Sequence, residues 1–260
     1  MNPSVLFVFI LSILLGVLRA ADLAFGTDAV TGLCVVGSVW WRYLALGIVV
    51  LAAVLVGRTQ PSHSEAVRSR RPLAGILAFV GAVCFLAAAG AQIALGAASG
   101  LGGFVRCILE CLCSAWLSTM GRCWLSPNEW KKPFGGLYLA VAGSVLFYWN
   151  VLMRFMENSS SWHRVAPTAA VWQALAALLL LSSLARALYL PKPENGRTLC
   201  AAGLAALCLC LCWELPHAAV LAVGAAAEPA LLPELFAALA LCCVGALGGV
   251  CAAACARRPE

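Results

Sequence analysis

The sequence contains few charged residues for its length. Only 11% of the 260 residues are Asp, Glu, Lys or Arg, whereas 63% are hydrophobic. The mean hydropathy is correspondingly high, at +0.95. In soluble domains charged residues make up about 25% of the chain, because they cover the surface that faces water. This chain has too few of them for that purpose, so the composition excludes an ordinary soluble protein.

The sequence patterns of several common enzyme classes are also absent. The chain contains no HExxH, GxSxG, P-loop or GxGxxG pattern, each of which places specific groups around a metal, a nucleophile or a phosphate. The polar segments between apolar stretches are short, so they leave no room for a separate catalytic domain. We therefore expect a protein that is not an enzyme and that uses no cofactor.

The chain has fourteen cysteines but no CxxC pair. Most of these cysteines lie within apolar stretches, and only Cys34 and Cys123 are expected in loops. A buried free cysteine behaves as a small hydrophobic residue. We therefore predict a structural role for the cysteines rather than a disulfide or redox framework.

The N-terminal segment lacks the basic region that begins a secretory signal. The chain starts with Met1, Asn2 and Pro3, and its first basic residue, Arg19, comes after the first apolar stretch. A signal peptide would carry its positive charge before that stretch and a small-residue cleavage site after it. We therefore expect the first apolar stretch to be retained as a membrane span.

Eight apolar stretches are long enough to cross a membrane. A helix needs about 20 mostly apolar residues to cross the hydrocarbon core of a bilayer. We therefore predict an all-α fold: a polytopic transmembrane helix bundle that forms one integral membrane domain over residues 1–260, in the lipid bilayer of the cell membrane. The predicted spans are about 4–20, 40–56, 72–95, 101–121, 136–153, 167–190, 199–223 and 231–255.

The basic residues predict the orientation of these spans. The fourth stretch contains Arg106 and Glu110, so we compared chains in which it does and does not cross. If it crosses and the N-terminus is cytoplasmic, twelve Lys and Arg residues lie on the cytoplasmic side and five on the outer side. If it does not cross, the numbers become six and eleven. Because Lys and Arg are enriched in cytoplasmic loops, we predict eight spans with both termini cytoplasmic.

The net charge of +6 follows from these loops and indicates no nucleic-acid partner. The sequence also allows a parallel repeat of four plus four spans, as some transporters have. Arg19 and Asp22 end the first stretch in the way that Arg154 and Glu157 end the fifth. Charged residues are common at span ends, so this similarity does not decide between a repeat and chance.

Polar residues near the spans gather at the outer end of the predicted bundle. Ionisable groups inside a bilayer usually face the bundle interior or a water-filled cavity. We therefore predict a polar vestibule above a tightly packed inner half, although the residues at the very ends of spans, namely Arg19, Asp22, Glu157 and Glu228, are expected at the lipid headgroups. The whole group comprises Arg19, Asp22, Arg42, Gln92, Arg106, Glu110, Asn150, Arg154, Glu157, Gln173, Glu214, His217, Glu228 and Glu234.

Arg106 and Glu110 form the first candidate pair. They are four residues apart, so they share one face of a helix. An arginine near a helix N-terminus opposes the helix dipole, so the pair is not placed for helix stability alone. Two interpretations stay open: a pair linked to a substrate or a proton, or an internal bridge that neutralises both charges.

Cys210, Glu214 and His217 form a second candidate group, on one stripe of the seventh span. A thiol, a carboxylate and an imidazole on one face could hold a soft or borderline metal, and His217 could instead relay protons. Pro216 removes a backbone hydrogen bond near Cys212 and loosens the helix beside them. Metal sites usually need further ligands, so we predict no metal and keep these three residues only as a candidate set.

Gly245 and Gly249 form a GxxxG pattern in the last span. Small residues at this spacing allow two helices to approach closely. The pattern predicts close packing, either within the chain or against a second copy or another membrane protein.

The best functional interpretation is a small-molecule or ion transport component, or a ligand-binding membrane subunit. In this interpretation Arg106, Glu110, Glu214 and His217 line a polar cavity that is open to the outer side. The alternative is a non-catalytic structural or regulatory membrane protein that acts through a partner. Whether Glu110 and Glu214 face one cavity separates the two interpretations, and neither names a substrate.

Overall fold

The computed structural model describes residues 2–28, 32–60, 63–98, 100–126, 132–156, 164–190, 192 and 194–256. Within these ranges the chain is helical apart from its connections, which contain one isolated antiparallel bridge between Thr27 and Cys34. Eight of the helices are long and apolar enough to cross a membrane. The predicted all-α class is therefore confirmed, and each of the eight predicted spans corresponds to a helix that could cross a membrane.

The helices follow the predicted spans closely. The fourth helix continues past residue 121 to Leu125, so the prediction that Cys123 lies in a loop is wrong. The helices are α1 (Pro3–Ala21) with the π-helical η1 (Asp22–Gly26), α2 (Val39–Thr59), η2 (Ser64–Arg68), α3 (Pro72–Ala94), α4 (Gly100–Leu125), α5 (Gly136–Met156), α6 (Val165–Tyr189), α7 (Asn195–Ala206), the π-helical η3 (Leu207–Cys212), α8 (Glu214–Ala227), η4 (Pro229–Leu231) and α9 (Leu232–Cys255).

Several helices begin at residues that favour a helix start. The side chain of Asn2 accepts a hydrogen bond from the backbone N–H of Ser4 at 3.3 Å, and Pro3 occupies the first turn of α1. Ser38 caps α2 in the same way through the N–H of Trp40 at 3.3 Å. Pro72 begins α3. Such residues satisfy, or do not need, the free N–H groups of a first turn, so the starts of these spans are readable in the sequence.

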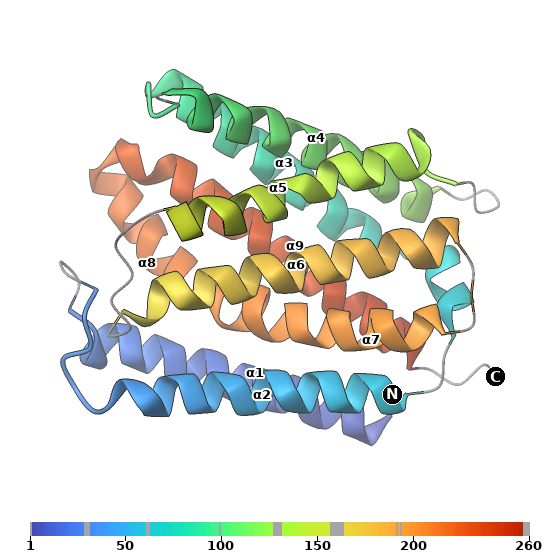
Figure 1. Cartoon of the computed structure of the whole chain (residues 1–260), viewed down its shortest axis with the longest axis horizontal. Coiled ribbons are helices and arrows are strands. Elements are labelled where there is room, and N and C mark those ends of the chain that lie inside the picture. Colours follow the sequence, from blue (N-terminus) through green and yellow to red (C-terminus); the bar gives the residue numbers. More distant parts are fainter. Residues whose placement is uncertain are drawn as a thin grey trace.

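The seventh span, which comprises α7, η3 and α8, and the eighth span, which comprises η4 and α9, form the centre of the bundle. The pair of α1 and α2 lies on one side of them and the group of α3, α4 and α5 on the other (Figure 1). The contacts agree with this view, because α7 packs against α2, α6 and α9, while α9 packs against α3, α7, α8 and η3. The prediction of a four-plus-four repeat and that of a single domain both stay predictions.

Glycines allow the two central spans to approach each other. A Cβ atom on Gly203 of α7 would lie 2.5 Å from the backbone oxygen of Gly248 on α9. A Cβ atom on Gly245 would lie 2.5 Å from the backbone nitrogen of Leu211 in η3. These distances are too short for any side chain, so only glycine permits this close packing of backbones.

The GxxxG pattern therefore faces the interior of the bundle. A Cβ atom on Gly249 would lie 2.8 Å from the side chain of Leu207, and both Gly245 and Gly249 are buried. The packing that the pattern predicts is found within the chain. An oligomer stays a prediction, but these two glycines are not on an outer face that could form it.

The seventh span is interrupted between α7 and α8. The N–H of Trp213 bonds to the carbonyl oxygen of Cys208 at 3.0 Å, a π-type bond five residues back along the chain. Pro216 follows in the first turn of α8 and has no N–H to donate to Cys212. The Cys212 carbonyl instead lies against α1, where a Cβ atom on Gly16 would be 2.7 Å from its oxygen. π-Helical segments of this kind are frequent at functional sites.

We expect Gly203→Ala to destabilise the protein. The added methyl group would overlap the Gly248 backbone, which cannot rotate away, and overpacking of this kind costs about 1–3 kcal/mol. The matched control is Gly90→Ala, because Gly90 is exposed on α3 and has no atom within 4 Å of a Cβ position. Thermal unfolding in detergent should show a lower midpoint for Gly203→Ala alone. Equal midpoints for the two variants would contradict the close approach of α7 and α9.

Candidate functional site

One end of the bundle contains a cavity of about 560 Å³. It lies at the end where α1, α3 and α5 finish and where α4, α6 and α9 begin, which we call the cavity end. Its lining brings together all four predicted ligand-binding residues, Arg106, Glu110, Glu214 and His217. Cavities of roughly 300–1,000 Å³ are of the size that holds small organic ligands.

Glu110 is held on one wall of the cavity by residues of α3 and α4. Its side chain is only 1% exposed. Gln92 Nε2 donates to both carboxylate oxygens at 3.0 and 3.1 Å, and Arg106 Nε donates to Oε1 at 3.0 Å. The Arg106 side chain is 40% exposed and covers the carboxylate. We call Gln92, Arg106 and Glu110 the Glu110 cluster.

The Glu110 cluster forms the neutralising bridge that the sequence allowed. Arg106 and Glu110 pair through the predicted four-residue spacing, and Gln92 adds two hydrogen bonds from a neighbouring helix. A buried carboxylate needs such partners, because its removal from water is costly. The bridge also lines the cavity, so the ligand-linked interpretation of the same pair stays a prediction.

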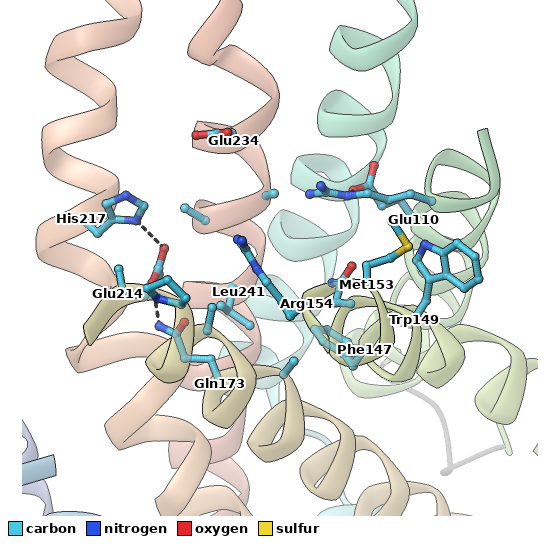
Figure 2. A pocket seen from close by; sticks show the side chains of 18 of the residues that line it. Glu110, Phe147, Trp149, Met153, Arg154, Gln173, Glu214, His217, Glu234 and Leu241 are labelled. Carbon is cyan, nitrogen blue, oxygen red and sulfur yellow. Dashed lines mark hydrogen bonds and ion pairs between the residues drawn. The ribbon is translucent and has the colours of Figure 1, made fainter. Parts of the chain in front are cut away.

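Glu214 is held on another wall by residues of α6 and α8. Gln173 Nε2 donates to Glu214 Oε2 at 2.6 Å and to the carbonyl oxygen of Leu209 at 3.1 Å. His217 Nδ1 lies 2.9 Å from Glu214 Oε1. We call Gln173, Glu214 and His217 the Glu214 cluster; its two hydrogen-bonded contacts are dashed in Figure 2.

The hydrogen bonds of Gln173 determine which way its amide points. Both groups near one amide atom, the Glu214 carboxylate and the Leu209 carbonyl, can only accept, so that atom must be the nitrogen. The amide nitrogen therefore faces Glu214, and the amide oxygen is directed away from it (Figure 2). Leu209 lies in η3, so the π-helical segment takes part in positioning this cluster.

Arg19 reaches the same cavity from the end of α1. Its guanidinium carbon lies 4.7 Å from the centre of the Trp213 ring, a cation–π arrangement, and its Nη1 donates to Asp22 Oδ2 at 2.8 Å. Arg19 is only 6% exposed. Arg19 is therefore enclosed by protein at this end of the bundle, and the prediction that Arg19 and Asp22 lie at the level of the lipid headgroups stays a prediction.

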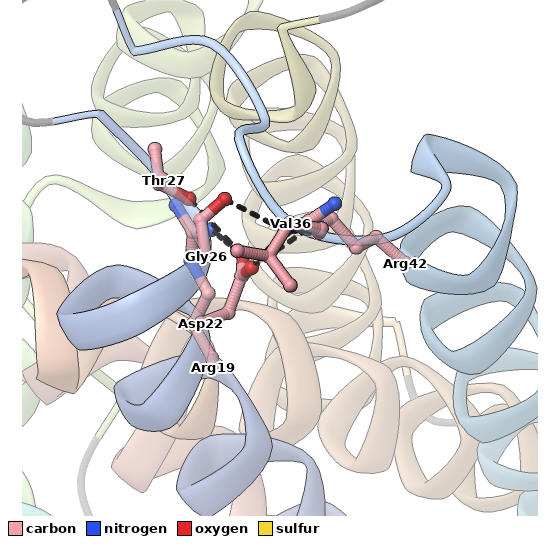
Figure 3. Close-up of polar contacts among 6 residues, drawn as sticks. All are labelled: Arg19, Asp22, Gly26, Thr27, Val36 and Arg42. Carbon is pink, nitrogen blue, oxygen red and sulfur yellow. Dashed lines mark hydrogen bonds and ion pairs between the residues drawn. The ribbon is translucent and has the colours of Figure 1, made fainter.

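Asp22 connects Arg19 to Arg42 across the first two spans (Figure 3). Arg42 donates to Asp22 Oδ1 through Nε at 2.7 Å and also through Nη2. The same Nη2 bonds to the carbonyl oxygens of Gly26 at 3.0 Å and Val36 at 3.1 Å. This network holds η1 against the start of α2, and thereby fixes Arg19 beside Trp213 and the Glu214 cluster. Of the other two terminal residues, Glu228 is exposed, and Glu157 lies outside the described residues.

The candidate metal set is not assembled. Cys210 donates through Sγ to the backbone oxygen of Gln173 at 3.4 Å, so its thiol is turned toward α6. Within the part of the chain that the structure describes, no three His, Cys, Asp or Glu residues come together as ligands for a metal ion. The interpretation of Cys210, Glu214 and His217 as one metal site is therefore wrong. All fourteen cysteines are free thiols.

The floor of the cavity is apolar. Phe85 and Phe147 pack edge to face, with ring centroids 6.1 Å apart and an interplanar angle of 76°, and Leu241 lines the cavity beside them. Glu110 lies ten residues from the start of α4, which corresponds to ~15 Å at a rise of 1.5 Å per residue. The cavity thus extends well into the bundle.

Several lining residues were not among the predicted site residues. Gln92 and Gln173 hold the two carboxylates, while Arg19, Arg154 and Glu234 add charge to the lining. The two glutamines are polar amides within otherwise apolar runs, and this isolation is a signal that the sequence carries. The role of Arg19 has no such signal, since it depends on Trp213 from a distant span.

No known protein family, curated protein or solved structure matches the chain.

We expect Asp22→Asn to destabilise the bundle. Both Arg19 and Arg42 would lose an ionic partner in a largely buried network, and the loss of one partner of a buried ion pair costs about 3 kcal/mol. Glu228→Gln is the matched control, because it removes one negative charge at the same end from an exposed side chain. Thermal unfolding should separate the two variants, and an unchanged midpoint for Asp22→Asn would contradict a stabilising role for the network.

Proposed function

We propose that this multi-pass protein binds a small polar solute in the cavity, as a small-molecule or ion transport component or as a ligand-binding membrane subunit. The observation that carries the proposal is that Glu110 and Glu214, buried residues on separate helices, line the same cavity. Arg106 and His217 are the accompanying ligand-binding or proton-binding residues.

The arrangement of the charges supports binding rather than packing alone. Ionisable groups within a membrane span are costly and commonly mark the path of a substrate or an ion. A bundle that used Glu110 and Glu214 only to join helices would need no shared space beside them. Here both line a space of about 560 Å³ together with Arg19, Arg154 and Glu234.

The position of the cavity supports the same proposal. Secondary transporters hold substrates near the middle of the bilayer, often beside discontinuous helices. The cavity reaches ~15 Å along α4, about half of a 30 Å hydrocarbon core. The interrupted seventh span contributes Glu214, His217 and Leu221 to its lining.

We further propose that the cavity end faces the outside of the cell membrane and that both termini are cytoplasmic. Basic residues at the opposite end support this orientation, among them Arg58 of α2, Arg122 of α4 and Arg186 of α6, because Lys and Arg are enriched on the cytoplasmic side. The cell membrane itself is a proposal that rests on the same charge pattern.

Reporter fusions test this orientation. We expect alkaline phosphatase fused after Arg164 to be active and the same enzyme fused after Lys192 to be inactive, because α6 separates these two points. Fluorescent-protein fusions at the two positions should give the opposite pattern, which also controls for expression. The reverse result for both reporters would place the cavity end in the cytoplasm.

Ligand-dependent stability tests the binding function. We expect some members of a panel of amino acids, sugars, organic cations, organic anions and inorganic ions to raise the unfolding midpoint of the purified protein. Binding to the native state alone stabilises by about 2.7 kcal/mol when the ligand is at 100 times its Kd. The double variant Glu110→Gln/Glu214→Gln should lose this effect, whereas Glu228→Gln should keep it.

The alternative, a structural or regulatory membrane protein that acts through a partner, gives a different result in the same experiment. No panel member would then stabilise the wild-type protein, and the double variant would differ from it only in unliganded stability. Retained stabilisation by a ligand in the double variant would also count against the proposed site.

A further inference from the structure

We propose that the solute is a zwitterion with an apolar substituent, a molecule that carries one ammonium group and one carboxylate as amino acids do. This inference rests on the proposed binding function and adds the chemical class of the ligand. It is argued from the charge balance of the cavity, from the unequal accessibility of its two buried carboxylates, and from its apolar floor.

Among the described residues that line the cavity, arginines and glutamates are equal in number. The arginines are Arg19, Arg106 and Arg154, and the glutamates are Glu110, Glu214 and Glu234. A charge that is removed from water without a partner is costly. A ligand with no net charge leaves this balance intact, whereas a simple anion or cation disturbs it.

The two clusters are not equally able to contact a ligand. Glu110 already accepts three hydrogen bonds, two from Gln92 and one from Arg106, and its side chain is 1% exposed. Glu214 accepts one from Gln173, contacts His217 and is 11% exposed. A carboxylate has about four acceptor positions. Glu214 therefore has more unused acceptor capacity than Glu110.

The wall formed by the Glu214 cluster is rich in acceptors. The Gln173 amide oxygen adds an acceptor to that of the Glu214 carboxylate, because the Gln173 nitrogen is committed to Glu214 and Leu209. An ammonium group has three N–H donors and no acceptor. This wall therefore matches the ammonium group of the ligand.

Arg154 supplies the matching cationic group. It lies in the last turn of α5 and lines the cavity, and in the view of Figure 2 its guanidinium stands between Glu214 and Glu110. A guanidinium has five N–H donors, so it can bind a ligand carboxylate in addition to an interaction that it already makes within the chain. A ligand whose ammonium group contacts Glu214 thus has a cationic partner for its carboxylate in the same cavity.

The floor accommodates an apolar substituent. Phe85, Phe147 and Leu241 close the cavity below the charged residues. Apolar walls with a few fixed polar groups are the usual composition of small-molecule sites, in which the polar groups orient the ligand. The remaining space favours a side chain that packs on these rings over the smallest zwitterions.

Three probes that share one apolar side chain and differ in their charged groups test the proposal. Leucine carries both charged groups, isopentylamine has the same side chain without the carboxylate, and 4-methylpentanoate has it without the ammonium group. Binding to the full-length protein in lipid nanodiscs is measured by calorimetry, with phenylalanine and glycine as further zwitterions. We expect leucine or phenylalanine to bind, glycine to bind less well, and each singly charged analogue to bind roughly 10- to 150-fold more weakly, since a charge-assisted contact contributes about 1.5–3 kcal/mol.

Two variants assign the charged groups. In Glu214→Gln the difference between leucine and 4-methylpentanoate should disappear, because the partner of the ammonium group is gone. In Arg154→Gln the difference between leucine and isopentylamine should disappear instead. Glu228→Gln is the control and should retain both differences. The unfolding midpoint of each unliganded variant verifies that it is folded, and Glu214→Asp, which keeps the charge, should restore part of the discrimination.

The outcomes separate this proposal from the one on which it rests. If a singly charged analogue binds as tightly as leucine, or if the cavity binds sugars or inorganic ions but no zwitterion, the ligand class is overturned and the binding function stands. If no member of either panel binds the wild-type protein, both proposals fail. Discrimination that survives both Glu214→Gln and Arg154→Gln overturns the assignment of these two residues.

Discussion

The cost of a charge in a bilayer governs how this structure is built. Every ionisable group within a span needs a hydrogen-bonding partner, because no bulk water is available to replace one. The two buried carboxylates meet this requirement in the same manner, each with a glutamine from a neighbouring helix and a basic residue one turn away. These hydrogen bonds therefore join four spans at the cavity end, where a purely apolar bundle would have no reason to leave space.

Backbone packing at the centre makes this arrangement possible. Gly203, Gly245 and Gly248 allow α7, η3 and α9 to approach at backbone distance. The π-helical turn in the same span changes the register of its hydrogen bonds and brings the Leu209 carbonyl within reach of Gln173. One half of the seventh span thus packs tightly against α9, and the other half carries Glu214 and His217. The π-helical η3 lies between the two halves and ends next to Glu214.

Much of the fold was predictable because the bilayer restricts the choices. Apolar runs of sufficient length must form helices there, and Pro3, Ser38 and Pro72 mark where some begin. That Arg106 and Glu110 share one helix face was predictable from their spacing, whereas their pairing with each other was not. The misplaced loop at Cys123 and the candidate metal set with Cys210 share a different origin. Each depended on neighbours from other spans, which periodicity along one helix does not describe.

The sequence by itself determined the class of the protein, the number of its spans and the residues that are costly to place in a membrane. Only the tertiary structure decided that Glu110 and Glu214 line one cavity, that Gln92 and Gln173 hold them, and that Arg19 stacks on Trp213. The physical reason is that hydrophobicity and helical periodicity are properties of a local segment. The partners of a buried charge come from helices that are distant in the chain, and packing alone selects them.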